Sequence, residues 1–178
     1  MLISRFHQSG VTLVELVVTL TILAILASLA VPSFQGVILN RQISSSAESI
    51  LNGLQIARAE AVRRNTQIQF VLGSGSAWTV GCITVTASCP ATIQSGATGD
   101  GSSDTVTVTA TPSGADTVAY NSFGATIPTV TDLTQLDFDL PSSVLPASET
   151  NNLRVVINSG GSARLCDPNI SPPDGRAC

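Results

Sequence analysis

Residues 10–32 read GVTLVELVVTLTILAILASLAVP, and this stretch decides the fold of the chain. Gly10 follows a short polar segment, and a single charge, Glu15, interrupts an apolar run of 21 residues. As a helix this run would be about 32 Å long, enough to cross a bilayer core of about 30 Å. The sequence therefore predicts a helix over residues 11–32 that spans a membrane or packs against like helices, preceded by a polar leader at residues 1–10.

A helical pattern continues beyond Pro32, although proline breaks an isolated helix. Apolar residues recur there at spacings of three and four, which is the stripe of an amphipathic helix. We expect one long helix over about residues 11–64, kinked near Pro32, whose second half at residues 33–64 packs on a folded domain. The stripe consists of Ile43, Ala47, Ile50, Leu51, Leu54, Ala57, Ala61 and Val62.

Beyond Asn65 the pattern changes to alternation and short apolar runs, which are typical of strands. The stretch Gln94–Ser103, rich in Gly, Ser and Thr, is expected to be a loop, and residues 158–162 to be a hairpin turn. We predict an α+β chain, in which the helix packs on a small antiparallel sheet within a β-rich head at residues 65–178. The predicted strands cover residues 67–72, 77–86, 104–111, 116–120, 135–140, 153–158 and 162–166.

Four cysteines, Cys82, Cys89, Cys166 and Cys178, all lie beyond the apolar run. An even number in an exported head indicates two disulfides and an oxidising compartment. Three connectivities are possible, and the local pairs Cys82–Cys89 and Cys166–Cys178 are favoured because each closes a short loop. Four free, buried thiols are the alternative.

Gly10 and Glu15 mark the junction between the polar leader and the apolar run. Gly10 leaves the next peptide bond uncrowded, so a membrane protease could reach it and leave Val11 with a free amine. Glu15 would then lie about one turn into the helix, where a carboxylate is costly, by about 2.5–3.5 kcal/mol at the bilayer centre and less near its surface. Pairing with the amine of its own or a neighbouring chain would lower this cost and set the register of a helical stack. The alternative is a tolerated polar residue in an anchor.

The run from Gly10 to Glu15, the short leader, the apolar helix and Pro32 together resemble the N-terminus of type IV pilins and type II secretion pseudopilins. The resemblance implies the pilin fold and cleavage after Gly10 by a prepilin peptidase, which also methylates the new N-terminus. Val11 departs from the family, in which Phe usually stands first. Thr12 and Glu15 are the residues to which the resemblance assigns assembly.

Two later stretches narrow the resemblance. Residues 51–65 resemble the amphipathic half-helix of the GspH/FimT group, and the ending around Cys166 and Cys178 resembles FimT/FimU-type minor pilins, which close their heads with a cysteine pair. Secretion pseudopilins of the GspH type more often lack that pair. The implied protein is a minor pilin with an inner-membrane helix and a periplasmic head, which joins or primes an extracellular pilus. The implied partners are major and minor pilins, the inner-membrane assembly platform and the prepilin peptidase, and a GspH-like pseudopilin of a periplasmic secretion filament is the alternative.

A third possibility is a DNA-binding minor pilin of natural transformation. The net charge of −4 argues against bulk binding to nucleic acid, and all the basic residues are arginine. Some FimT-like pilins bind DNA through a Gly-Arg-x-Arg segment, and the matching stretch Gly161–Arg164 keeps only the second arginine, with Ser162 in place of the first. Arg154, Arg164 and Arg176 are the candidate contacts, and so few arginines imply weak, salt-sensitive binding.

Three arginines near the end of the predicted helix, Arg58, Arg63 and Arg64, form another candidate patch for DNA or lipid. We favour their being the solvated side of the helix, with Glu60 nearby to offset their charge.

The sequence offers little for catalysis, and no enzyme, cofactor or metal is predicted. The only histidine, His7, lies in the segment expected to be removed, and the chain has no lysine. The acidic pairs Asp137/Asp139 and Asp100/Asp104 lack the spacing of a calcium loop, and the first pair is expected on the wet side of a strand. Aromatic side chains, including Trp78 and Tyr120, are expected in the core rather than on a ligand platform.

Overall fold

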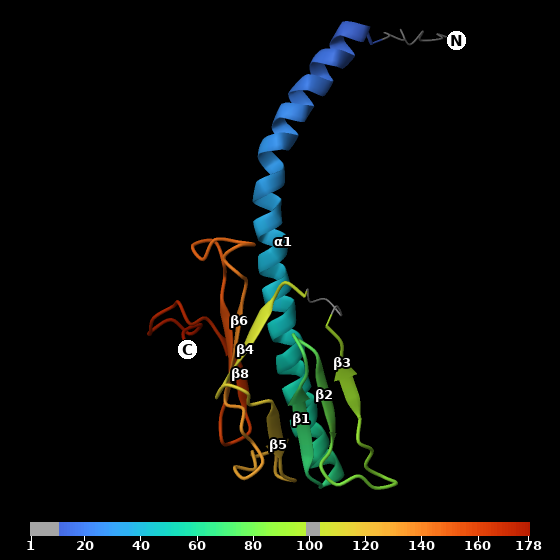
Figure 1. Ribbon diagram of the computed structural model, residues 1–178, viewed down its shortest axis with the longest axis vertical. Coiled ribbons are helices and arrows are strands. Elements are labelled where there is room, and N and C mark those ends of the chain that lie inside the picture. Colours follow the sequence, from blue (N-terminus) through green and yellow to red (C-terminus); the bar gives the residue numbers. More distant parts are fainter. Residues whose placement is uncertain (1–10, 99–103) are drawn as a thin grey trace, which may run out of the picture. The chain divides into compact units, whose positions relative to one another are not determined.

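A computed structural model of the chain describes residues 11–98 and 104–178, apart from the side chains of residues 29–33 (Figure 1). The chain divides into two compact units, Met1–Val37 and Ile38–Cys178. The predicted leader, including Gly10 and His7, lies outside the described residues, and the kink at Pro32 stays a prediction.

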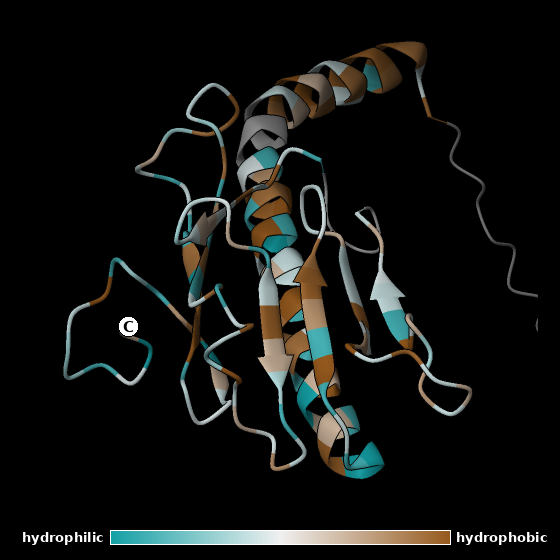
Figure 2. Ribbon diagram, turned by 60° about the horizontal axis from the view of Figure 1, so that its bottom comes forward, coloured by the Kyte–Doolittle hydropathy of each residue, from teal (hydrophilic) through white to brown (hydrophobic). Residues whose placement is uncertain are grey.

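The first unit contains the beginning of the long helix α1, Leu13–Arg64. Every side chain of residues 11–28 is exposed, and most of them are apolar, as the brown colour of this part of the helix indicates (Figure 2). The hydroxyls of Thr19, Thr21 and Ser28 each donate to the carbonyl three residues earlier, so the few polar groups are satisfied within the helix. In the part of the chain that the structure describes, no helix has both the length and the apolarity of a membrane span.

The second unit contains the rest of α1, and there one side of the helix is buried. Six residues of the predicted stripe are at most 1% exposed, which confirms the stripe over most of its length. Two predicted members differ, because Leu51 is only partly buried and Val62 is 53% exposed. The buried members are Ile43, Ala47, Ile50, Leu54, Ala57 and Ala61.

Eight strands in the described residues form two antiparallel four-stranded sheets rather than the one small sheet predicted. The strand orders are β3-β2-β1-β5 in the first sheet and β4-β6-β7-β8 in the second. Figure 1 shows both sheets beside the C-terminal half of α1. The strands are β1 Ile68–Leu72, β2 Trp78–Cys82, β3 Gln94–Gly96, β4 Thr107–Thr111, β5 Thr117–Tyr120, β6 Gln135–Asp139, β7 Leu153–Ile157 and β8 Ala163–Cys166.

Strand β3 is the one that the sequence prediction missed. Residues 94–96 were expected in a loop, but Gln94 pairs with Val80 and Gly96 with Trp78. A Cβ atom on Gly96 would lie 2.5 Å from the Trp78 indole nitrogen, so the glycine that suggested a loop instead lets the strand pass close to a large ring. The predicted strand at 77–86 was also too long, because β2 ends at Cys82.

One hydrophobic core joins the helix to both sheets. Trp78 and Tyr120 are buried in it, as predicted, and the Trp78 indole donates to the Ser49 hydroxyl at 3.0 Å. Burial raises the pKa of the Tyr120 phenol, and its hydroxyl has no hydrogen-bond partner among the described residues. The prediction fails for Phe34, which is 65% exposed, and for Phe123, which is 88% exposed.

The hairpin turn predicted at residues 158–162 is confirmed. The Asn158 amide donates to the Ser162 carbonyl at 2.9 Å, and the Gly161 amide donates to the Asn158 carbonyl at 2.8 Å. Strand β6 also alternates as predicted: Leu136 and Phe138 are buried, whereas Asp137 and Asp139 lie on the wetter side.

Candidate assembly site

The start of α1 is fixed by Thr12. Its Oγ1 accepts the Glu15 amide at 3.2 Å, and its carbonyl accepts the Leu16 amide at 3.1 Å, which is the first helical bond. A threonine that caps the amide three residues later forms half of a capping box, in which glutamate is favoured at the second position. This role of Thr12 was missed from sequence, although the spacing Thr-x-x-Glu signals it.

Glu15 consequently lies in the first turn of the helix. Its negative charge is favourable there, because unpaired backbone amides make a helix N-terminus partly positive. Val11 precedes the cap and is exposed. Val11, Thr12 and Glu15 are therefore brought together within one turn, whereas Gly10, after which cleavage is predicted, lies outside the described residues.

An exposed apolar surface surrounds this turn. Its size exceeds that of the scattered surface hydrophobics of ordinary soluble proteins, and a surface of this kind marks a membrane or protein contact. Its large apolar members are Val11, Leu13, Val14, Leu16, Val17, Val18, Leu20, Ile22, Leu23, Ile25 and Leu26.

The other end of α1 carries a charged cluster around Glu60. The Oε2 atom of Glu60 lies 2.6 Å from Arg63 Nη2 and 2.6 Å from Arg64 Nε. The hydrogen bond from Arg63, followed by that from Arg64, holds the pKa of the Glu60 carboxyl below its ordinary value, although partial burial acts against them. Arg64 also donates to the Ser88 carbonyl at 2.7 Å, so it ties the helix to the loop after β2 and is not simply a solvated side chain.

Arg58 is exposed, as predicted, but it also makes a contact that the sequence did not indicate. Its Nε donates at 3.0 Å to the carbonyl of Gly124, which follows β5 in the first sheet. Gly124 in turn touches the β7–β8 turn of the second sheet, because a Cβ on Gly161 would lie 1.8 Å from the Gly124 carbonyl oxygen. Arg58 therefore holds the helix at the seam between the sheets, and only the positive φ of +81° at Gly161 and the absence of a side chain allow that approach.

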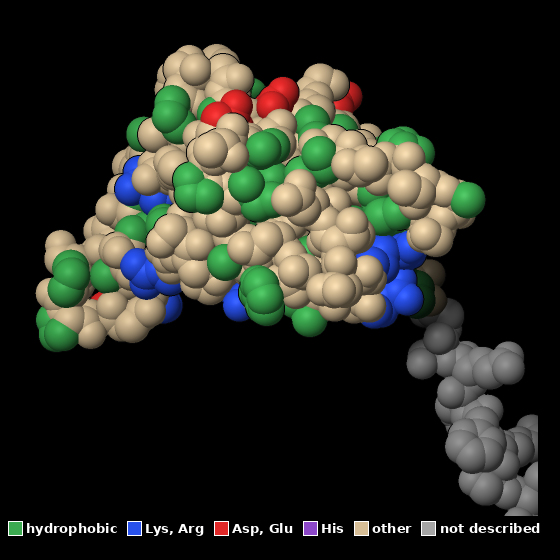
Figure 3. Space-filling view, turned by 90° about the horizontal axis from the view of Figure 1, so that it is seen from below, with side chains coloured by type: hydrophobic (Ala, Val, Ile, Leu, Met, Phe, Trp, Pro, Cys, Tyr) green, Lys and Arg blue, Asp and Glu red, His purple; other side chains and the backbone are tan. Residues whose placement is uncertain are grey.

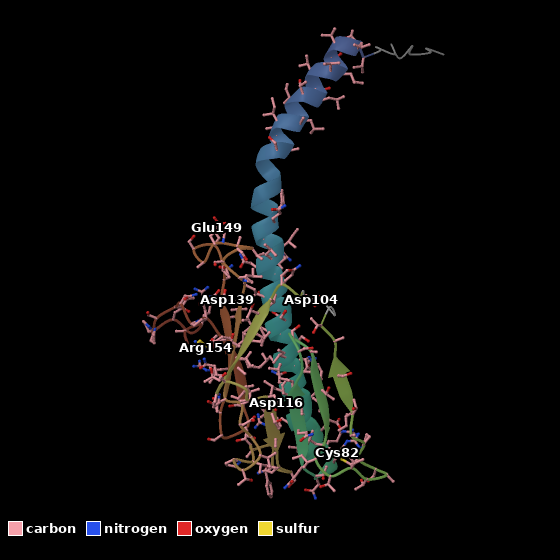
Figure 4. The ribbon with its side chains drawn as sticks, viewed as in Figure 1. Cys82, Asp104, Asp116, Asp139, Glu149 and Arg154 are labelled. Atoms are coloured by element: carbon pink, nitrogen blue, oxygen red, sulfur yellow. A yellow bond between two sulfur atoms is a disulfide. The ribbon has the colours of Figure 1, made fainter. Side chains whose placement is uncertain are left out.

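The three arginines predicted as DNA contacts all have oxygen partners. Arg154 Nε lies 2.6 Å from Asp137 Oδ1, across neighbouring strands, and Arg176 Nη2 lies 3.0 Å from Asp174 Oδ2 (Figure 4 labels Arg154). Arg164 donates to the main-chain oxygens of the last two residues, Ala177 and Cys178. These contacts neutralise or occupy each guanidinium, so the three residues do not form a free basic patch.

Two disulfides join Cys82 to Cys89 and Cys166 to Cys178, and these are the local pairs favoured from sequence. The second closes the irregular tail after β8. Backbone hydrogen bonds support the tail as well, from Asp167 N to Arg176 O at 2.8 Å and from Ala177 N to Asp174 O at 3.0 Å.

The described residues contain no group of three or more side chains that could hold a metal ion. Asp137 is instead engaged by Arg154. Asp100 lies outside the described part of the chain, so the Asp100/Asp104 pair is not tested.

Comparison with known structures finds two crystal forms of the type IV minor pilin FimU from Pseudomonas aeruginosa PAO1. They share 17% and 18% of their residues with this chain, at TM-scores of 0.50 and 0.51. The similar part covers 74% of this chain and 93% and 98% of the two FimU chains. This likeness concerns the fold. No curated relative matches the chain.

Two family descriptions match the sequence itself. The prokaryotic N-terminal methylation motif matches residues 5–31, and the family described as type II transport protein GspH matches residues 46–161. These two family matches, together with a β-rich head that has the fold of FimU, indicate the pilin class of structural subunits. Within that class, the chain belongs to the GspH family, because the match extends over more than half of its length.

Proposed function

We propose that the chain is a minor pilin of a type IV pilus and acts as a structural subunit rather than an enzyme. Cleavage after Gly10 exposes the amine of Val11, which the peptidase methylates. The helix then holds the subunit in the inner membrane with its head in the periplasm. From there the assembly platform draws it into a filament of major and minor pilins, or into a complex that primes one.

The observation that carries this proposal is the geometry of the helix start. Thr12 begins α1 so that Glu15 lies in its first turn, surrounded by exposed apolar side chains. A lone carboxylate on such a surface favours a cationic partner that shares the apolar environment. The amine of Val11 in a neighbouring subunit meets that requirement and would set the axial register of the helices.

Mass spectrometry of the mature full-length protein tests the processing. We expect a chain that starts at Val11, carries one additional methyl group and weighs four hydrogens less than the reduced form, because both disulfides are closed. A mature chain that starts elsewhere contradicts the proposal.

A Glu15→Leu variant tests assembly separately. It keeps the helix apolar and removes the charge, so we expect normal cleavage but loss of the subunit from sheared filaments. A Thr19→Val variant is the matched control, since the Thr19 hydroxyl donates to the Leu16 carbonyl of its own helix. Equal incorporation of wild type and Glu15→Leu would contradict the role of Glu15.

The second candidate is a pseudopilin of type II secretion, which the GspH family description favours. The pilus is preferred because of the likeness to FimU and the Cys166–Cys178 pair, which resembles the closed tail of FimT/FimU-type pilins. Deletion of the gene distinguishes the two. Loss of pili with intact secretion supports the pilus, and loss of secretion with intact pili supports the pseudopilin.

We do not propose the DNA-receptor role. Its candidate contacts, Arg154, Arg164 and Arg176, already bind oxygens of the protein. A gel-shift assay at low salt with the detergent-purified full chain tests this choice, and a shift that Arg164→Ala removes would overturn it.

A further inference from the structure

Phe123 is held out into solvent by a tight turn between β5 and the following loop. Asn121 builds the turn: its Oδ1 accepts the amides of Phe123 at 2.9 Å and Ala125 at 3.1 Å, and its carbonyl accepts the Gly124 amide at 2.9 Å. The bond from Arg58 to the Gly124 carbonyl attaches the turn to the helix. A large aromatic ring, 88% exposed on a hydrogen-bonded base, is preorganised for a protein contact.

A hollow of about 520 Å³ lies beside this ring. Its floor is the last part of α1, and Val62, the outward member of the helical stripe, adds a second exposed apolar side chain. The Phe123 hollow is lined by Gln55, Arg58, Ala59, Val62, Arg63 and Phe123.

The Phe123 hollow has an excess of positive charge. Arg58, Arg63 and Arg64 lie in or beside it, and Glu60 is the carboxylate that pairs with the last two. No carboxylate forms an ion pair with Arg58 within the described ranges. Figure 3 views this end of the head and shows basic side chains beside hydrophobic ones, with most of the visible acidic side chains along one margin. The hollow therefore suits a partner that offers carboxylates beside apolar groups.

The opposite end of the head offers carboxylates, and Val144, in the segment between Asp139 and Glu149, is 42% exposed. Asp104, Asp139 and Glu149 are exposed there, and none has an ion pair among the described residues (Figure 4). Glu149 lies near the beginning of the second unit's helix, because Asn40 donates to the Glu149 carbonyl at 2.9 Å. Arg41, which follows Asn40 on α1, is also exposed. We call these three carboxylates the acidic end.

The two ends cannot meet within one head. Along α1, Asn40 and Arg63 are separated by about 35 Å at the rise of a regular helix. Two unlike, complementary surfaces at opposite ends form a heterologous contact, which leads to an open stack rather than a closed dimer.

We propose that the Phe123 hollow docks the acidic end of a second copy of this chain, head to tail. This inference rests on the proposed function as a filament subunit and adds the faces by which its heads meet. Phe123 and Val62 are buried against the loops of the neighbouring head, and its carboxylates face Arg58 and Arg63. The contact is longitudinal, along the direction of the second unit's helix.

Site-specific photo-crosslinking of the full chain in its own membranes and filaments tests the contact. A benzoylphenylalanine at position 123 should give a dimer whose crosslinked peptide comes from residues 139–150 of a second copy. The same probe at Val130, which is 39% exposed and does not line the hollow, is the control and should give at least about fivefold less dimer.

Charge reversal tests complementarity. Arg63→Glu and Glu149→Arg should each lower the dimer yield about three- to tenfold, and the double variant should restore it, since exposed ion pairs contribute modestly and like charges repel. The inference is overturned if the adduct forms with another protein or with lipid, or if no adduct forms. It is also overturned if neither charge reversal changes the dimer yield. In each of these cases the sheared filaments are also examined for the wild-type chain. If the chain is present there, the proposed function stands. If it is absent, that function is contradicted as well.

Discussion

The two halves of α1 are one continuous helix that meets two different surroundings. From Leu13 to Ser28 every side chain faces outward, whereas from Ile43 to Ala61 one stripe is buried in the core of the head. The first half has its apolar groups on all sides and the second on one side only. The second half buries its apolar side against the sheets of its own chain. The apolar surface of the first half is left for contacts outside the chain.

The largest expected effect comes from emptying the buried stripe. Ile50→Ala should lower the free energy of unfolding of the head by about 2–5 kcal/mol, because Ile50 is 0% exposed and leaves a cavity. Leu20→Ala, at a position 55% exposed in the first half, should change it by less than about 0.5 kcal/mol. Fluorescence of the single tryptophan, Trp78, during denaturation of the full chain in detergent measures both. Equal losses would break the distinction between the halves.

A somewhat smaller effect should follow at the seam where Arg58 holds the second half to both sheets. Gly161→Ala should cost about 2–3 kcal/mol, because its φ is +81° and the new methyl would meet the Gly124 carbonyl oxygen. Gly160→Ala is the matched control, since nothing lies within 4 Å of a Cβ at that position. The same denaturation assay should place the control within about 0.5 kcal/mol of wild type.

At the other end of the helix, removal of the cap should have a local effect. Thr12→Ala should destabilise the first turn by about 1 kcal/mol, because the Glu15 amide loses its acceptor. Amide hydrogen exchange in detergent should be faster at Glu15 and Leu16 and unchanged at Ile50. Faster exchange in both halves would show that they unfold together and would weaken the comparison.

The smallest expected effect is a pH dependence at the end of the buried half. The folded state lowers the pKa of Glu60, chiefly through its hydrogen bond from Arg63, so the unfolded state binds the proton more readily. The stabilisation is therefore fully present at pH values above 4.5, the ordinary pKa of the group. It is lost as the pH falls through the lower pKa of the folded state. Glu60→Gln should be less stable than wild type at neutral pH and equal to it at strongly acidic pH. A difference that stays constant with pH would contradict the ion-pair explanation.

Local patterns in the sequence were sufficient to predict the helix and most of the strands. Repeats of three and four residues predicted the buried stripe from Ile43 to Ala61, and alternation predicted β6 and β7 within one residue of their ends. The failures concern contacts between distant segments. The composition of residues 94–96 is typical of a loop, but these residues form a strand because they pair with β2. The division into two sheets likewise depends on which strands pair with one another.

The candidate site divides in the same way. The motif from Gly10 to Glu15 and the cysteine pairing could be inferred from short-range spacing. The partners of Arg58, Arg154 and Arg164 could not, because each binds an oxygen at least 13 residues away in sequence. The sequence alone does not indicate which oxygen accepts a hydrogen bond from an arginine, because the fold brings the two groups together.

The placement of the disulfides has a mechanical consequence. Both are closed within the β-rich head, between Cys82 and Cys89 and between Cys166 and Cys178, and α1 has no cysteine. Apart from the main chain at residues 65–67, a pulling force on the helix therefore reaches the described sheets through side-chain packing and a few hydrogen bonds such as that from Arg58 to Gly124. Under tension the helix would slide out of the head as the weak element, while each crosslinked loop kept its length. The force at which the helix separates from the sheets is therefore set by the buried stripe rather than by either disulfide.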